Sequence, residues 1–453
     1  MTQCTSQLSL GFHPDLPVVV EFDAPEISSD GGALLLRQVD DSLGLTAGFA
    51  ACLSDDRDPL RCLHSRHEQT RQRVFQIALG YEDCNDADRL RHDPLLKTVC
   101  DRAALAAGEG LSSQPTLSRF EGAQKGMTLR RLVRHLENSY VAELPADTQV
   151  IVLDLDATAD ETHGAQQLSF FSGFYDQFIY HPLLVFDSGS GQLISAILRP
   201  GKVHASRGAS GVLRRLIRKI KRRFPQAQIA VRADSGFCTP TLLATLENLD
   251  VELGDVDYLF GLPKNPVLLR HAHSAMSLAQ DLYRRKGSKA QVFASFFYAA
   301  GSWPRQRFVV AKAEHGALGA NPRFLVTSLC GFPPDILYHA YCERGQCENL
   351  IKDLKNALQA DRLSCSAFPA NFFRLLLHAL AYRLLHALRK RVAEHSAELG
   401  RAQFDTLRLR LLKVAAWVSQ SVRRILVRLP KAFPYAEIFH HLCAPGLAPP
   451  TTA

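Results

Sequence analysis

Residues 148–160, TQVIVLDLDATAD, form the stretch that decides the fold. Its first half is a run of apolar and β-branched residues, which is typical of a buried strand. Asp154 and Asp156 follow at the end of the run and lie two positions apart, so both side chains point to one face of the strand. A carboxylate is costly inside a core but useful at the edge of a sheet. The stretch therefore predicts a strand that carries acidic groups to a site.

The residues beyond this stretch predict an α/β arrangement. Two apolar runs in residues 182–201 flank the turn DSGSG and predict a β-hairpin. The pattern then predicts a helix at 210–224, a strand at 228–236, a helix at 239–249 and a strand at 257–263. Residues 290–330 alternate as antiparallel strands do, and residues 28–143 have helical spacing. Residues 416–430, AWVSQSVRRILVRLP, fit either a strand or a helix.

The composition is that of a globular protein. Of the 453 residues, 46% are apolar and 22% charged, which suits about two or three domains. The net charge of +8 suits a polyanionic partner such as nucleic acid, although many basic proteins bind none. The 11 cysteines include no C-x-x-C pair, so we expect free thiols in a reducing cytosol and no zinc ribbon. Without a signal-peptide pattern or a run of about 20 apolar residues, we expect a soluble cytoplasmic protein with no membrane partner.

A third acidic residue ends another predicted strand. Asp234 lies in VRADSGF, residues 231–237, directly before a turn. In α/β sheets the loops at the strand ends gather binding and catalytic groups. The alternative for any one of these aspartates is that its side chain only caps the turn that follows it.

Residues 341–355, YCERGQCENLIKDLK, predict a helix with a polar stripe. At about 100° per residue, four of its side chains fall within a wedge of about 60°: Tyr341, Arg344, Glu348 and Lys355. An apolar stripe lies beside the wedge, so the four side chains could face a cleft. They could equally form a solvated surface with an Arg344–Glu348 ion pair worth a few tenths of a kcal/mol. The helix alone does not decide between the two.

Two strand-end aspartates and a helical glutamate can together hold hard divalent cations. Mg²⁺ prefers oxygen ligands and commonly uses one or two carboxylates per ion together with phosphate oxygens. Two such ions about 3.5–4 Å apart can activate a water or a 3′-OH and stabilise the leaving oxygen in an attack on a phosphodiester. The three acidic residues therefore favour phosphodiester chemistry.

The helix also carries a resemblance to a known family. The spacing Y-(2)-R-(3)-E-(6)-K in residues 341–355 matches the signature of bacterial insertion-sequence transposases of the DDE class. Four segments resemble the branch known as the insertion-sequence thirteen-eighty family: FDAPEISSDGGALLLRQVDDSLGL, GYEDCNDADRLRHDPLLK, LDLDATADETHGAQQ and VRADSGF. The resemblance covers roughly residues 20–440, and the signature is strongly specific because two Asp motifs precede it in order.

The resemblance implies a catalytic triad that also binds metal, formed by Asp156, Asp234 and Glu348. The cofactor it implies is Mg²⁺, with Mn²⁺ as a substitute. We prefer Asp156 to Asp154 because Asp156–Thr158 looks like the D-x-T element of the family, and Asp154 remains the rival.

The remaining signature residues would contact DNA. The resemblance implies that Arg344 and Lys355 grip phosphate near the cleavage site, and that Tyr341 packs on the strand or hydrogen-bonds to it.

The fold implied by the resemblance is α/β, with an RNase H-like core that holds a mixed five-stranded sheet and flanking helices. A mostly β insertion would separate Asp234 from Glu348, which agrees with the alternation at 290–330. The expected domains are a flexible N-terminus (1–18), a helical N-terminal DNA-end-binding domain (19–145), the first part of the catalytic core (146–264), a β-rich insertion (265–336), the second part of the core with C-terminal helices (337–443) and a flexible tail (444–453).

The function implied is that of a DNA transposase. It would bind the terminal inverted repeats of its element, cleave there with two divalent metal ions and join the 3′-OH ends to target DNA. Its partners would be double-stranded DNA, as transposon ends and target, and a second copy in a homodimer on DNA, near the bacterial nucleoid. The alternatives are an RNase H-like nuclease without strand transfer, and a non-catalytic or domesticated DNA-binding regulator.

A strongly basic run offers a surface for DNA phosphates. Residues 214–223, RRLIRKIKRR, place seven cations in ten residues: Arg214, Arg215, Arg218, Lys219, Lys221, Arg222 and Arg223. Such contacts supply affinity but no sequence choice, and the alternative is a solvated face. Trp303 lies beside two arginines in GSWPRQRF and could stack on a flipped base, or it could pack on its own sheet.

Overall fold

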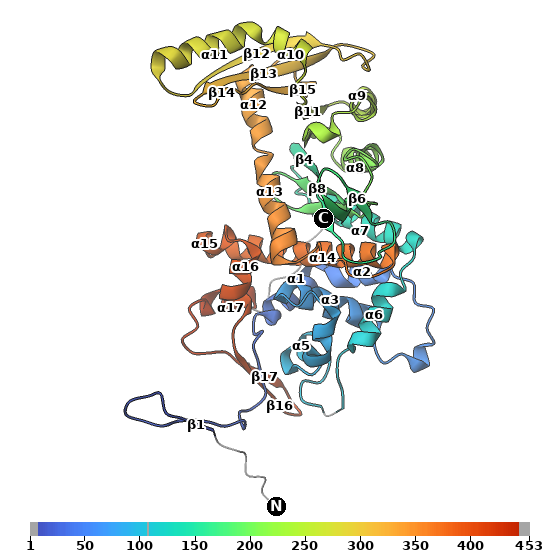
Figure 1. Ribbon diagram of the computed structural model, residues 1–453. Coiled ribbons are helices and arrows are strands. Elements are labelled where there is room, and N and C mark those ends of the chain that lie inside the picture. The colour runs from blue at the N-terminus through green and yellow to red at the C-terminus, as the bar shows by residue number, and fades with distance from the viewer. Residues whose placement is uncertain (1–7, 107, 444–453) are drawn as a thin grey trace, which may run out of the picture. The chain divides into compact units, whose positions relative to one another are not determined.

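A computed structural model describes residues 8–106 and 108–443 (Figure 1). The expected tail at 444–453, and residues 1–7 of the expected flexible N-terminus, lie outside the described residues. The described chain divides into two compact units. The first unit holds residues 8–51, 55–120 and 387–443, and the second holds 52–54 and 121–386. Each unit is therefore considered by itself.

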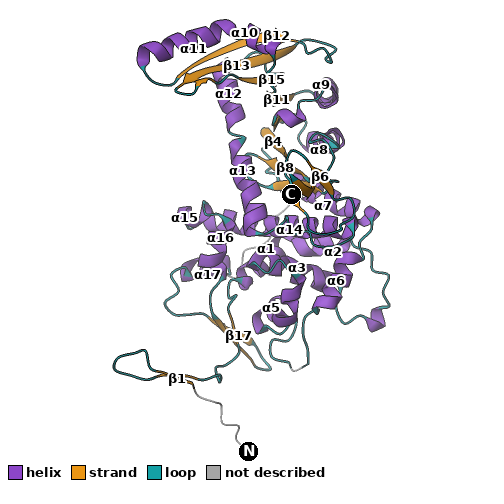
Figure 2. Cartoon of the chain, in the orientation of Figure 1, coloured by secondary structure: helices purple, strands orange, loops and turns teal. Residues whose placement is uncertain are grey.

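The first unit is mostly helical, as the spacing in residues 28–143 predicts (Figure 2). Its helices and single helical turns are α1 (Ala33–Leu43), α2 (Leu45–Ala51), η1 (Pro59–Arg61), α3 (Arg66–Leu79), η2 (Cys84–Asp86), α4 (Ala87–Leu90), α5 (Pro94–Val99), α15 (Ala397–Gly400), α16 (Phe404–Leu407), η5 (Arg408–Leu412) and α17 (Ala436–Leu442). Two helices cross a unit boundary along the chain: α6 (Gln114–Gly122) and α14 (Phe368–Ala393).

Helix α3 is the buried centre of this unit. It begins where the Oγ of Ser65 accepts a hydrogen bond from the backbone N–H of Glu68, at 3.0 Å, as an N-cap does. It ends at Gly80, whose φ of 92° suits a left-handed C-cap. Every residue from Gln69 to Leu79 is buried, so the helix packs on all its sides.

The first unit also joins the two ends of the chain through a small sheet. Strand β3 (Ile27–Ser28) pairs with β16 (Ala416–Gln420), which pairs with β17 (Ile425–Arg428). The ambiguous segment 416–430 is thus a β-hairpin. A separate two-stranded hairpin is formed by β1 (Leu8–Leu10) and β2 (Val18–Val20).

The second unit is built on a nine-stranded mixed sheet. The strands follow the order β12-β13-β15-β11-β10-β4-β8-β9, with β14 paired to β13. Their bounds are β4 (Val150–Ala157), β8 (Leu183–Asp187), β9 (Leu193–Ile197), β10 (Gln228–Ala233), β11 (Val256–Leu262), β12 (Ala290–Tyr298), β13 (Arg307–Gly316), β14 (Gly319–Ala320) and β15 (Arg323–Thr327). The strands predicted between 148 and 330 are confirmed.

The sheet has more strands than the five expected. Strand β10 lies parallel to β4 and to β11, while β8 is antiparallel to β4 and to β9. Strand β15 pairs antiparallel with β11, β13 pairs antiparallel with β15, and β12 pairs antiparallel with β13. The strands of the β-rich insertion therefore extend the same sheet, because backbone pairing continues past β11.

One face of the sheet is covered by helices α7 (Gly126–Glu143), α8 (Ala209–Arg223) and α9 (Pro240–Leu253). The helix predicted at 210–224 is confirmed as α8, and its apolar face is buried: Val212, Leu213, Leu216, Ile217 and Ile220. Two further helices lie between β11 and β12: α10 (Pro266–His271) and α11 (His273–Lys286), which packs on β12 and β13.

The single helix expected at 341–355 is interrupted. Helix α12 (Pro334–Cys342) ends, α13 (Gly345–Lys352) begins two residues later, and a π turn, η4 (Asp353–Ala357), follows. Glu343 and Arg344 keep helical dihedral angles, so the chain continues in the same sense. Because the hydrogen-bond pattern changes at both junctions, the angular positions predicted for a regular helix do not hold over this segment.

A second small sheet follows the end of β4. It has the order β5-β7-β6, formed by β5 (Asp160–Glu161), β6 (Phe170–Ser172) and β7 (Gln177–Tyr180). Among the helices that the structure describes, none is both long and apolar enough to cross a membrane.

Candidate active site at the ends of β4 and β10

The aspartates of β4 point away from the helices that cover the sheet. Ile151, Leu153 and Leu155 enter the core that contains the apolar residues of α8. Alternation along the strand then places Asp154 and Asp156 on the opposite face. This is the shared face that the sequence predicts.

Asp154 forms a buried ion pair with an arginine of the neighbouring strand. Arg232 of β10 lies opposite Asp154 in the parallel register, and its guanidinium bonds both carboxylate oxygens, at 2.7 and 2.8 Å. The Arg232 side chain is 3% exposed and that of Asp154 1%. Arg232 also donates to the carbonyl of Ala340 at 2.6 Å and to the Oγ of Ser188. The carboxylate of Asp154 is therefore fully engaged inside the protein.

Asp156 is paired less tightly and stays accessible. Its Oδ2 accepts one hydrogen bond from the Nη1 of Arg344, at 3.0 Å, and both side chains are 15% exposed. Its Oδ1 accepts from the backbone N–H of Ala157 at 2.8 Å. Burial raises the pKa of Asp156, against the lowering effect of Arg344, and the charge of Asp234 raises it further. Asp234 follows Ala233, the register partner of Leu155, so Asp156 and Asp234 lie at adjacent strand ends.

Asp234 begins the turn after β10. Its Oδ1 accepts from the backbone N–H of Gly236 at 2.9 Å and caps the short helix η3 (Ser235–Phe237). The capping role weighed for such aspartates is present here, together with the proximity to Asp156. One carboxylate thus fixes a turn at the strand end beside that of Asp156.

Tyr341 and Arg344 approach the two aspartates from α12 and the junction that follows it. Burial raises the pKa of Tyr341, as does Asp234, whereas Arg344 lowers it. The Tyr341 hydroxyl lies so near Gly261 that a Cβ there would be 2.8 Å from it. Burial alone would lower the pKa of Arg344, but the charges of Asp156, Tyr341 and Asp234 raise it. Arg344 therefore stays a cation between acidic neighbours.

The structure adds an aromatic residue that the sequence analysis missed. Tyr175, in the β6–β7 turn, has its pKa raised by burial, and the charges of Asp156 and Asp234 raise it further. It belongs to FFSGFYDQF, residues 170–178, in which Phe174 is 88% exposed and Phe178 56%. Five aromatic residues in nine positions was the signal that could have found this surface.

Lys355 secures the chain just beyond Asp156. Its Nζ donates to the carbonyl of Ala159 at 2.6 Å and to the Oγ1 of Thr158 at 3.2 Å. It also pairs with Asp160 at 3.2 Å and with Asp361 at 3.6 Å. In this conformation the ammonium group is held by four neighbouring side-chain and backbone oxygens.

Glu348 is exposed on α13, whereas the preceding residue, Cys347, is fully buried. Burial is the main cause that raises the pKa of Cys347, and the charges of Asp156 and Asp154 raise it further.

Two carboxylates at adjacent strand ends are a donor set that suits a hard divalent cation. Among the residues that the structure describes, however, no group of three His, Cys, Asp or Glu side chains is placed to hold a metal ion. The donor chemistry of Asp156 and Asp234 fits a cation, and the position of Glu348 in this conformation does not complete the set.

The basic run on α8 is largely paired within the unit. Arg215 and Lys219 both contact Glu137, which is fully buried, and Arg218 contacts Glu252 at 2.7 Å. Three members are exposed along the helix: Arg214, Arg222 and Arg223. A hollow of about 290 Å³ lies over the helix. It is lined by Gly211, Arg214, Arg215, Arg218, Lys219 and Arg222. The surface is basic, but fewer of its cations are unpaired than the run of seven cations in the sequence indicates.

Lys221, the remaining member of the run, is buried. Its Nζ donates to the carbonyl of Pro225 at 3.4 Å and lies 3.9 Å from Asp255.

Trp303 packs on its own sheet. It is 9% exposed within the core of the second unit. Its ring lies edge-on to Tyr298, with centroids 5.6 Å apart, and the guanidinium of Arg307 sits 4.9 Å from the ring. In this conformation the indole has no free face for a base.

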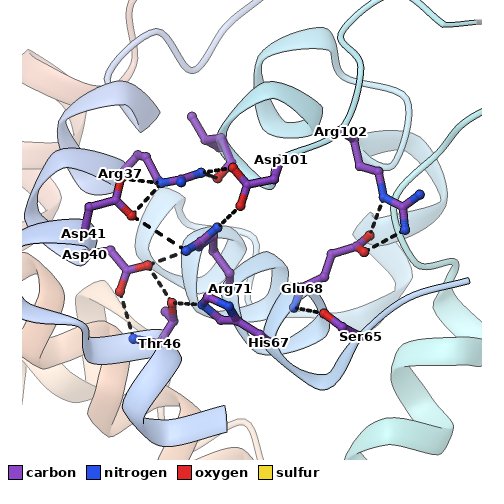
Figure 3. Close-up of polar contacts among 11 residues, drawn as sticks. Arg37, Asp40, Asp41, Thr46, Ser65, His67, Glu68, Arg71, Asp101 and Arg102 are labelled. Carbon is purple, nitrogen blue, oxygen red and sulfur yellow. Dashed lines mark hydrogen bonds and ion pairs between the residues drawn. The ribbon is translucent and has the colours of Figure 1, made fainter. Parts of the chain in front are cut away.

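The first unit contains a separate polar cluster (Figure 3). Arg71 of α3 lies between three carboxylates: Asp40 at 3.1 Å, Asp41 at 3.7 Å and Asp101 at 2.5 Å. Arg102 and Glu68 form a second pair at 2.7 Å. These contacts tie α1, α3 and the turn after α5 together beside a cavity of about 330 Å³. Since the charges satisfy one another, the cluster is best described as structural.

Comparison with known proteins shows the family of the chain. The sequence model of the family described as "Transposase DDE domain group 1" matches residues 12–445. No curated protein matches the sequence. Among solved structures, the chain is similar to a piggyBac transposase in a synaptic complex with hairpin DNA. The identity is 11% and the TM-score 0.42, over 85% of this chain and 79% of that chain.

Proposed function

The chain belongs to the transposase DDE domain group 1 family, and from that premise we propose that it is a DNA transposase of the insertion-sequence thirteen-eighty branch. It binds the terminal inverted repeats of its element, cleaves phosphodiester bonds there and joins the 3′-OH ends to target DNA by transesterification. Its partners are double-stranded DNA, as transposon ends and target, and a second copy of the chain on DNA. It acts at the bacterial nucleoid.

The catalytic core is RNase H-like in this proposal. The strand order β9-β8-β4-β10-β11 supports it, with β10 and β11 parallel to β4 and β8 antiparallel. A five-stranded mixed sheet of this kind presents the ends of β4 and β10 side by side, where the acidic residues lie.

The observation that carries the proposal is the placement of Asp156 and Asp234 at adjacent strand ends, with the guanidinium of Arg344 bonded to Asp156. The pair would hold Mg²⁺, or Mn²⁺ in its place, with Glu348 as the third member. Such an ion supplies charge stabilisation to the attacked phosphate. The two hydrogen bonds from Arg232 to the oxygens of Asp154 favour Asp156 over Asp154 for this role.

The neighbouring side chains would position the DNA. Arg344 neutralises Asp156 in the free protein and would turn to a phosphate when DNA arrives, because a guanidinium pairs readily with phosphate oxygens. Tyr341 would contact the strand, and Lys355 would hold the segment after Asp156 in place. The exposed cations of α8 would contact DNA away from the reacting bond.

The test is a cleavage and strand-transfer assay on DNA that carries the ends of the element, with Mg²⁺. We expect Asp234→Asn and Glu348→Gln each to lower the cleavage rate by roughly a hundredfold or more. Glu343→Gln is the matched control, since Glu343 is an exposed glutamate of the same segment whose side chain pairs with Arg232 at 3.3 Å. Unchanged cleavage by Asp234→Asn or Glu348→Gln would show that the assigned triad is wrong.

The same assay separates the alternatives. A nuclease of the same core would cleave the ends but leave the target DNA unjoined. A DNA-binding regulator would bind the ends and do neither, with or without the acidic residues. We favour the transposase because the family match covers nearly the whole chain and not the core alone.

A further inference from the structure

The β1–β2 hairpin, hereafter the N-terminal arm (residues 8–25), is largely exposed to solvent. Its two strands pair only over Leu8–Leu10 and Val18–Val20. Large apolar side chains are exposed along it, including Phe12 at 76%, Leu16 at 67% and Phe22 at 80%. Among the described elements, the two strands pack on each other and on no other strand or helix to a similar extent (Figure 1).

Such an arm is not stable on its own. An isolated two-stranded hairpin is marginal in water, and it leaves unpaired backbone groups at both edges. Large apolar groups exposed together usually mark an interaction site. The arm is fixed to the first unit where it ends, since the N–H of Val418 donates to the carbonyl of Glu26 at 3.0 Å. The arm therefore starts from a defined point and needs an apolar partner with a free strand edge.

The charge of the arm argues against nucleic acid as that partner. Residues 1–36 contain no lysine or arginine and five acidic residues: Asp15, Glu21, Asp23, Glu26 and Asp30. A DNA backbone would repel such a segment. The partner should instead be basic and partly apolar.

A surface with those properties exists on this chain. Residues 406–436 contain seven cations and no acidic residue. Within them, the β16–β17 hairpin exposes Arg423, Arg424 and Arg428 beside two exposed apolar residues, Val422 at 107% and Ile425 at 39%. In the sheet order β17-β16-β3, strand β17 is the edge strand. It therefore offers backbone groups, apolar side chains and positive charge together.

We propose that the N-terminal arm of one copy adds as a strand to the β17 edge of a second copy, and that the second copy returns the same contact. Two-fold symmetry makes such an exchange self-complementary and doubles each gain in buried area. The arm continues along the chain into β3, which lies at one edge of the β17-β16-β3 sheet. Strand β17 lies at the opposite edge of that sheet, so it is left for the arm of the partner. The contact forms in the free protein, without DNA. It thus gives a structural basis to the dimer proposed above and does not depend on catalysis.

The test is the mass of the full chain in solution without DNA, by light scattering or sedimentation over a range of concentrations. The chain of 50.2 kDa should form a dimer. Asp15→Lys with Asp23→Lys should weaken the dimer at least about tenfold, and so should Arg423→Glu with Arg424→Glu, because each places like charges in contact. The chain that carries all four changes should recover the dimer. Arg285→Glu with Lys286→Glu on α11 is the control of equal charge change, and it should leave the dimer intact.

The variants lie on the surface, so circular dichroism and the melting temperature should stay close to those of the unchanged chain. A chain that is monomeric at every concentration would overturn the proposal. So would arm variants that lower the melting temperature of a monomer, since the arm would then cover its own copy. If the Arg423 and Arg424 reversals abolish duplex DNA binding and leave the mass unchanged, the hairpin serves DNA and the proposal also fails.

Discussion

Asp154 and Asp156 lie two residues apart on one face of β4, and each is paired with one arginine. The pair Asp154–Arg232 has both side chains at most 3% exposed and two bonds of 2.7 and 2.8 Å. The pair Asp156–Arg344 has one bond of 3.0 Å, and both side chains are 15% exposed. The same two residue types therefore make a buried ion pair in one place and a partly exposed ion pair in the other.

The difference follows from where the arginines come from. Arg232 belongs to the neighbouring strand, so the backbone ladder fixes its distance from Asp154. Arg344 lies at a helix junction, and its guanidinium reaches Asp156 through a long side chain that water can approach. A buried pair that loses one member leaves an uncompensated charge, whereas an accessible one is re-solvated.

The largest expected effect breaks the buried pair. Arg232→Ala should lower the free energy of unfolding by about 3–5 kcal/mol, because it leaves the carboxylate of Asp154 buried without its cation. Arg344→Ala should lower it by only about 1 kcal/mol. Urea denaturation of the two variants and the unchanged chain measures both. Equal losses would contradict the distinction between the pairs.

A third aspartate sharpens the comparison through its pH dependence. Asp160 is buried and paired with a lysine, Lys355, at 3.2 Å, and burial raises its pKa to about 7 in spite of that cation. Since the ordinary pKa of an aspartate is near 4, the folded state binds the extra proton between about pH 4 and 7. The free energy of unfolding should therefore fall as the pH rises through this window, by up to about 1.4 kcal/mol per unit, and level off above it.

The control for this pH dependence is Asp160→Asn, which removes the titrating group. The slope of unfolding free energy against pH between about 4 and 7 should become flatter in that variant. A slope that is unchanged would assign the effect to other groups.

Metal binding should involve the partly exposed pair Asp156–Arg344 and not the buried pair Asp154–Arg232. If Asp156 and Asp234 hold Mg²⁺, a concentration of about 100 times Kd would raise the free energy of unfolding by about 2.7 kcal/mol. Asp234→Asn should abolish that rise. Arg344→Ala should strengthen the binding, because the guanidinium no longer competes for the Oδ2 of Asp156. Thermal melting with and without Mg²⁺ measures all three, and a rise that survives Asp234→Asn would place the ion elsewhere.

The smallest effect on stability is expected at the exposed aromatic turn. Phe174→Ser should change the free energy of unfolding by less than about 0.5 kcal/mol, since the ring is 88% exposed. The same change should weaken the binding of element ends that carry unpaired bases, because bases stack on aromatic rings. Phe297→Ser on β12, which is 57% exposed, is the control and should leave that binding unchanged.

The local elements could be predicted from the sequence because their signals are short in range. The helix α8 and the strands β4, β8, β9 and β10 all follow from the periodicity of apolar residues. The interruption between α12 and α13 could not be found this way. Glu343 and Arg344 are ordinary helix residues, and only the hydrogen bonds made in the folded chain end one helix and begin the next.

The sequence by itself determined that Asp154 and Asp156 share a face, that α8 is basic on its outer side, and that the arm is acidic and apolar. Only the tertiary structure decided which charged side chains are paired and buried and which are exposed. It pairs Asp154 with Arg232, 78 residues away, ties Arg215 and Lys219 to the buried Glu137, and leaves Glu348 exposed. The reason is physical: the solvation of a charged group depends on which distant segments exclude water from it, and spacing along the chain does not carry that information.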